Sequence, residues 1–187
     1  MAQIDFETLT LYAKKFSGLT PEREILLVRI APAISPSLVK ITDAFYDTLA
    51  TIPATAPFIE GRLDLLKQTH IRWLNSLFTG PFDVDYTKSM YRVGHVHVKV
   101  NLPVEFMAGG MALIGDRLIA EIEHHYVDDA QLRLAALGAV NAILGFSLIV
   151  MQQSFQNASL HEELEKFLKI TGMSRNLFNN LAAAYSK

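Results

Sequence analysis

The sequence predicts a single all-α domain. It has 187 residues, of which half are hydrophobic and only 19% are charged, and this composition supports a sizeable core and excludes intrinsic disorder. Apolar residues recur every three to four positions through most of the chain, whereas strand-like alternation is rare. Together with the helix start and stop signals below, this pattern predicts a bundle of about eight helices.

The first third of the chain carries clear helix boundaries. Gly18 is a natural stop for the first helix, and Thr20 with Pro21 supplies an N-cap and a first-turn proline for the second. Ser35 and Pro36 repeat that signal and open a third. We therefore expect three helices, over residues 6–17, 21–31 and 36–52.

The remainder of the chain continues the helical pattern. Asp83, Pro103 and Asp128 or Asp129 mark further helix starts, and Ser159 with Glu162 forms a capping box for a last amphipathic segment. The helices before that segment are expected over residues 63–79, 84–100, 103–126 and 130–156. We accordingly expect a domain at residues 1–157 and an amphipathic connector or tail at residues 158–187.

One segment is apolar enough to raise the question of a membrane span. Leu134–Met151 carries no charge and reaches the minimum length for a spanning helix. A helix buried in a soluble core has the same composition, and we favour it. Gly138, Ala142 and Gly145 form a small-residue stripe along which another helix can approach closely. No secretory signal is visible near the N-terminus, so we expect a cytoplasmic protein.

Composition and motifs exclude several functions. The net charge of −2 and the absence of a Lys/Arg cluster give no reason to expect binding to nucleic acid. Without cysteine there is no thiolate metal site. Phosphate-binding loops, the G-x-S-x-G elbow and H-E-x-x-H are all missing. We therefore do not expect an enzyme.

Two histidines are placed on the inward faces of predicted helices. His70 and His97 share a stripe with apolar residues, whereas His95 points outward and the pair at 124–125 lies at a solvated helix end. Each inward histidine could be a core residue satisfied by a backbone carbonyl. Two together, beside Phe45 and Tyr46, also suit the axial ligation of a haem in an apolar slot. Both interpretations stay open on the residues alone.

Four motifs make the chain similar to the sensor globins, the haem-binding domains of globin-coupled sensors. The resemblance covers about residues 6–156, and both the motifs and their spacing match. The motifs are Asp43-Ala44-Phe45-Tyr46, Leu66-Lys67-Gln68-Thr69, Leu77-Phe78-Thr79-Gly80, and the run from Arg92 through Gly94, His97 and Asn101 to Pro103. The resemblance implies a globin fold with an extra N-terminal helix.

The resemblance also implies roles for individual residues. His97 resembles the proximal haem ligand, and Tyr46 the distal tyrosine that donates a hydrogen bond to bound oxygen. Thr69 matches a distal residue that assists or replaces that tyrosine. His70 matches a position from which some members occupy the sixth iron position, which would make the chain a bis-histidyl redox or slow-ligand sensor. The remaining residues of the expected pocket are apolar: Phe45, Leu66, Val93 and Met107.

The implied function is haem-based gas sensing. The cofactor would be haem b, the ligand oxygen or another diatomic gas, and the receiver of the signal a downstream transmitter domain or partner protein. The last two long helices would pair with their copies in a homodimer, which offers a second explanation for the small-residue stripe. A rival from another class is a haem-free interaction module of the stressosome type, whose pocket is filled by side chains. One departure, Asn101 in place of a common glycine, leaves the end of the proximal helix undefined.

Overall fold

The computed structural model describes residues 4–185 and confirms the all-α prediction. Within these residues there are helices and no strand. The elements are α1 (Phe6–Ser17), α2 (Pro21–Ile34), the 3₁₀ turn η1 (Ser35–Ser37), α3 (Leu38–Ala50), α4 (Ala56–Ile59), α5 (Leu63–Ser76), α6 (Val84–Lys99), α7 (Val104–His125), α8 (Ala130–Thr171) and α9 (Arg175–Tyr185).

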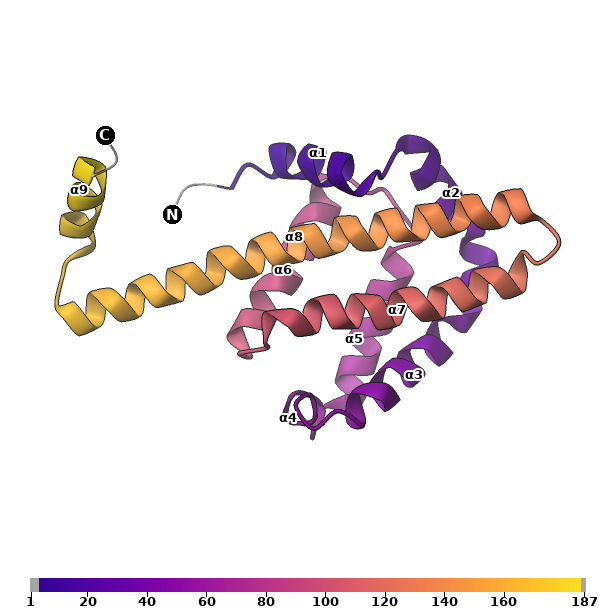
Figure 1. Ribbon diagram of the computed structural model, residues 1–187, viewed down its shortest axis with the longest axis horizontal. Helices are drawn as coiled ribbons and strands as arrows, with labels where there is room; N and C mark the ends of the chain where they lie inside the picture. Colours follow the sequence, from indigo (N-terminus) through magenta and orange to yellow (C-terminus); the bar gives the residue numbers. More distant parts are fainter. Residues whose placement is uncertain (1–3, 186–187) are drawn as a thin grey trace.

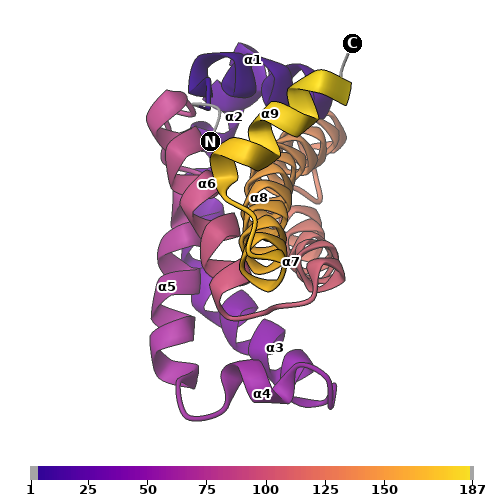
Figure 2. The same ribbon diagram turned by 90° about the vertical axis from the view of Figure 1, so that its left-hand side faces the viewer.

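The long helix α8 is the axis of the domain. It packs against α6, α7, α2 and α1, and α7 runs back along it as its antiparallel neighbour (Figure 1). Helices α3, α4 and α5 lie on the side of the bundle away from α1, as both views show (Figures 1 and 2). Helix α3 packs on both α5 and α7. We call α3, α4 and α5 together the α3–α5 wall, which faces α6 and α7.

Predicted side-chain caps mark the starts of α2, α6 and α8. The Asp83 carboxylate accepts hydrogen bonds from the amides of Asp85 and Tyr86 at 3.0 and 3.1 Å, and Asp129 accepts one from Leu132 at 2.8 Å. Thr20 caps α2 as expected. The prediction at Ser35-Pro36 was only partly right, because α2 continues to Ile34 and these residues form the 3₁₀ turn that precedes α3.

The apolar segment of α8 lies in the core of the domain. Two stretches, Pro21–Ala50 and Ala130–Thr171, are long and apolar enough to cross a membrane by length and composition alone. The central turns of α8 are buried by the neighbouring helices, with Ile143, Phe146 and Val150 fully enclosed. This is the pattern of a central core helix, which passes the same composition test as a membrane span.

The small-residue stripe is used within the chain. A Cβ built on Gly145 would lie 3.4 Å from the Ser17 side chain of α1, and one on Gly138 would lie 3.2 Å from the Arg23 guanidinium of α2. Ala142 between them is completely buried. The expected close helix packing is therefore present within the chain, with α1 and α2 as the partners; a seam between two copies stays a prediction.

The C-terminal segment differs from the prediction. Ser159 lies inside α8, which continues without interruption to Thr171 and ends at Gly172 with φ 68°, so the expected capping box at Ser159 is wrong. Past Asn157, which still bonds to Tyr91 of α6, the C-terminal end of α8 extends beyond the rest of the bundle and carries α9 (Figure 1). The boundary at residue 157 stays a prediction, and the outermost residues of the two expected segments, 1–3 and 186–187, lie outside the described residues.

Candidate functional site

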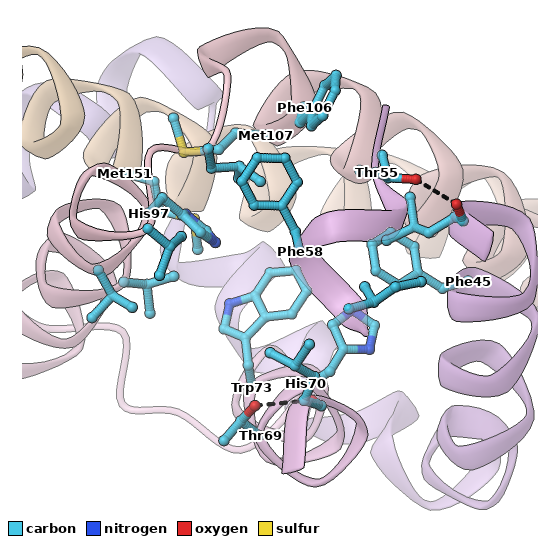
Figure 3. A pocket seen from close by; sticks show the side chains of 18 of the residues that line it. Phe45, Thr55, Phe58, Thr69, His70, Trp73, His97, Phe106, Met107 and Met151 are labelled. Atoms are coloured by element: carbon cyan, nitrogen blue, oxygen red, sulfur yellow. Dashed lines mark hydrogen bonds between the residues drawn. The ribbon is translucent and has the colours of Figure 1, made fainter. Parts of the chain in front are cut away.

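A cavity of about 580 Å³ opens between the α3–α5 wall and helices α6 and α7. This is within the range of roughly 300–1,000 Å³ usual for cofactor and small-molecule sites. Its lining is mainly apolar, with side chains from α3 to α8 (Figure 3). All eight residues predicted from the sequence line it: Phe45, Tyr46, Leu66, Thr69, His70, Val93, His97 and Met107.

His97 lines the cavity from the last turn of α6. It lies on the opposite side of the pocket from Phe45 and His70 in the view of Figure 3. Its Nδ1 is buried and has no hydrogen-bond partner among residues 4–185, and burial lowers the pKa of His97. The imidazole is therefore a neutral nitrogen donor at physiological pH, as a metal ligand must be. His95 is exposed, as its outward position predicted.

The end of α6 is fixed directly after His97. The amide of Leu102 donates to the His97 carbonyl at 3.0 Å, and Asn101 adopts φ 53°. Asparagine is one of the few residues besides glycine that tolerates this left-handed conformation. Asn101 thus adopts the left-handed backbone conformation at a position where glycine is common. The sequence left the end of this helix undefined, and the structure places it at Lys99.

Gly94 brings α6 into close contact with α8. A Cβ at this position would lie 2.2 Å from the carbonyl oxygen of Met151 and 2.8 Å from the Cβ of Ser154. No side chain larger than hydrogen fits between the two backbones. Since Met151 also lines the cavity, this contact sets the position of the α6 turn that carries His97.

His70 is held on the opposite wall by α3. Its Nδ1 is 3.0 Å from the hydroxyl oxygen of Thr42, and its ring stacks on Phe45 with a centroid distance of 4.7 Å and an interplanar angle of 12°. Its Nε2 is buried and has no hydrogen-bond partner in the part of the chain that the structure describes. Burial lowers the pKa of His70 to about 4, so this imidazole is neutral as well.

Tyr46 and Thr69 differ in how they face the cavity. Tyr46 is buried, and desolvation raises its pKa to about 12, so its phenol keeps its proton and can donate a hydrogen bond. Thr69 is exposed, and its hydroxyl donates to the carbonyls of Leu65 and Leu66 in its own helix. The structure therefore places Tyr46 inside the pocket and Thr69 at its rim.

Several lining residues were missed by sequence reasoning. Phe58 and Trp73 lie in the middle of the pocket in the view of Figure 3, and the Trp73 Nε1 is 3.2 Å from the sulfur of Met90. Arg62 and Arg92 bring positive charge to an otherwise apolar lining, where they could pair with carboxylates of a cofactor. Trp73 alone carried a signal, since it lies on the same stripe as His70.

Comparison with known proteins places the chain in a family. The Protoglobin family model matches residues 7–161. The globin domain of the Geobacter sulfurreducens globin-coupled sensor is 31% identical and superposes with a TM-score of 0.73, covering 78% of this chain and 96% of that domain.

Two structures of a more distant domain share the fold. They are the ferrous and ferric forms of the globin domain of E. coli DosC, which are 19% and 20% identical to this chain, each with a TM-score of 0.63. They cover 75% and 76% of this chain and 97% and 99% of their own. With a family model matching most of its length, the chain belongs to the Protoglobin family and has the globin fold.

Proposed function

We propose that this chain is a haem-binding gas-sensing domain with haem b in the cavity between α3–α5 and α6–α7. The observation that carries the proposal is a pair of neutral imidazoles, His97 and His70, on opposite sides of an apolar cavity of about 580 Å³, each with a buried nitrogen that lacks a protein partner. Unsatisfied buried nitrogens are rare in folded proteins and indicate a missing partner. When bound, haem iron supplies a coordination position for a diatomic gas.

His97 is the residue we assign to the proximal side. Its helix, α6, is fixed at its C-terminal end by the turn at Asn101 and along its length by the contact of Gly94 with α8. Met107 and Val93 supply apolar surface beside it. A neutral imidazole on a helix fixed at these two points meets the requirements of a preorganised ligand.

Tyr46 is the residue we assign to gas discrimination. Its protonated phenol lies in the pocket and makes no hydrogen bond to another described residue. A fixed O–H donor at this position would stabilise a strongly polarised ligand such as oxygen more than the less polarised carbon monoxide. Phe45 and Leu66 supply apolar surface on this side of the cavity.

Replacing Tyr46 with phenylalanine is expected to accelerate oxygen dissociation by roughly 10- to 100-fold, because a hydrogen bond to a charged acceptor contributes about 1.5–3 kcal/mol. Stopped-flow displacement of oxygen measures this rate. Tyr12→Phe is the matched control, since Tyr12 is exposed on α1 and away from the pocket. An oxygen off-rate that is equal in Tyr46→Phe and the control would contradict the assignment.

The rival function, a haem-free interaction module, requires a pocket filled by side chains. The open cavity supports the haem-binding proposal instead. Purification after haem-replete expression separates the two, because only the haem-binding protein would be red.

Signalling would run from α6 to α8. The two helices pack against each other. A buried hydrogen bond joins Tyr86 to Ser147 at 3.1 Å, and the Asn157 amide donates to the Tyr91 hydroxyl in a partly buried bond, also at 3.1 Å. We propose that a shift of His97 is passed through these contacts to α8 and on to a transmitter domain or partner protein.

A homodimer through α7 and α8 would use the exposed Ile119 and Leu134 rather than the glycine stripe. No catalytic step is assigned to this chain.

A further inference from the structure

The hydrogen bond between Thr42 and His70 is enclosed in the protein. Thr42 lies on α3 and is completely buried, and its Oγ1 is 3.0 Å from Nδ1 of His70 on α5. Other threonine hydroxyls in this region bond to their own helix, as Thr48 does to the Ala44 carbonyl at 2.8 Å. The hydroxyl of Thr42 instead has the His70 ring as its only hydrogen-bond partner among the described residues.

This arrangement favours one tautomer of the imidazole. If Nδ1 carried the proton and donated it to Thr42, the hydroxyl hydrogen of Thr42 would be buried without an acceptor. If the hydroxyl donates to Nδ1, that hydrogen is satisfied and only the Nε2–H of His70 lacks a partner. A buried, unsatisfied donor is costly, so the second arrangement leaves fewer such groups.

The orientation of the ring is also fixed. Phe45 stacks on one face of His70, Tyr46 meets it edge-on at a centroid distance of 5.6 Å, and Trp73 lies at 5.5 Å. A ring flip would exchange Nδ1 for a carbon atom at Thr42 and lose the hydrogen bond. His70 therefore keeps Nδ1 on Thr42 and Nε2 as its free nitrogen.

We propose that Thr42 is a positioning residue that holds the proton of His70 on Nε2, so that His70 acts as a second hydrogen-bond donor to a polarised gas ligand in the cavity. The inference rests on the proposed function for the identity of that ligand, but not for the tautomer. It opposes a sixth-ligand role for His70, which requires an unprotonated Nε2.

The tautomer can be measured independently of haem. We would record ¹⁵N spectra of histidine-labelled full-length chain, both as haem-free protein and in the diamagnetic ferrous carbon monoxide form. The expected result is a protonated Nε2 and an unprotonated Nδ1 at His70 in the wild type and in Thr42→Ser, with loss of this preference in Thr42→Val. A protonated Nδ1 in the wild type, or the same tautomer in Thr42→Val, would overturn the proposal.

Oxygen kinetics test the consequence for the ligand. Thr42→Val should accelerate oxygen dissociation by roughly threefold to tenfold, because it removes the preference for the donating tautomer but leaves the imidazole in place. His70→Leu, which removes the donor altogether, should do so at least as strongly. Thr42→Ser, which keeps the hydroxyl, should match the wild type. Equal rates in all four proteins, or a six-coordinate ferrous state that depends on His70, would refute the donor role. Failure to take up haem would refute the proposed function while the ¹⁵N result on haem-free protein still decides the role of Thr42.

Discussion

His97→Ala is expected to abolish stable haem uptake. Of the two neutral imidazoles on opposite sides of the cavity, His97 is the one whose helix is fixed at its end by Asn101 and along its length by Gly94. Its removal leaves no imidazole on that side of the cavity to hold iron. The measurement is the haem content of protein purified after haem-replete expression, read from its Soret absorbance relative to its protein absorbance.

His95→Ala provides the matched control. His95 lies two residues away on the same helix but is exposed and does not line the cavity, so this variant should retain the wild-type haem content. Circular dichroism of both variants would show whether the fold is kept. Full haem content with wild-type affinity in a folded His97→Ala variant would contradict the proximal assignment.

Gly94→Ala is expected to destabilise the domain and to impair the proximal side. The new Cβ would meet the Met151 carbonyl at 2.2 Å, and because the obstacle is backbone, α6 must move away from α8. Overpacking of this kind costs about 1–3 kcal/mol, which outweighs the roughly 1 kcal/mol that alanine gains over glycine in a helix. Urea denaturation should show a lower free energy of unfolding, together with reduced haem affinity.

Gly109→Ala is the control for this substitution. Gly109 is a helical, exposed residue of α7, and a Cβ built on it meets no atom within 4 Å. This variant should be as stable as the wild type or up to about 1 kcal/mol more stable. Equal stabilities for the Gly94 and Gly109 variants would show that the α6–α8 contact does not depend on glycine.

The helices and the orientation of the histidines could be predicted from the sequence because they depend on local rules. The 3.6-residue period placed His70 and His97 inside and His95 outside, and side-chain caps such as Asp83 marked helix starts. The meeting of all predicted lining residues at one cavity is consistent with the family resemblance, which supplied their relative placement. Periodicity alone gives the face of a helix but not its neighbour.

Features that depend on contacts between distant segments were missed for that reason. Gly94 is one glycine inside a helical pattern, and nothing in its local sequence reveals that Met151 lies against it. Thr42 is a polar residue within the helical pattern of α3, and nothing in its local sequence shows that its partner is His70 of another helix. The stripe at Gly138 and Gly145 correctly indicated close packing, yet it could not show that α1 and α2 are the partners.

The error at Ser159 has a different origin. The Ser159 and Glu162 pair matches a capping box by type and spacing, but a serine can also lie within a continuous helix if its neighbours stay periodic. Gly172, which ends α8 with φ 68°, was the true stop signal. Helix signals specify possible boundaries, and the packing of α8 against the bundle decides which of them is used.

The absorption spectrum of the purified wild-type chain tests the central claim most directly. After haem-replete expression, we predict a red protein with a Soret band and about one haem per chain, whose ferrous spectrum changes on exposure to oxygen and returns when oxygen is removed. A folded, colourless protein that takes up no haem on titration would contradict the account and leave the cavity between His97 and His70 without its proposed cofactor.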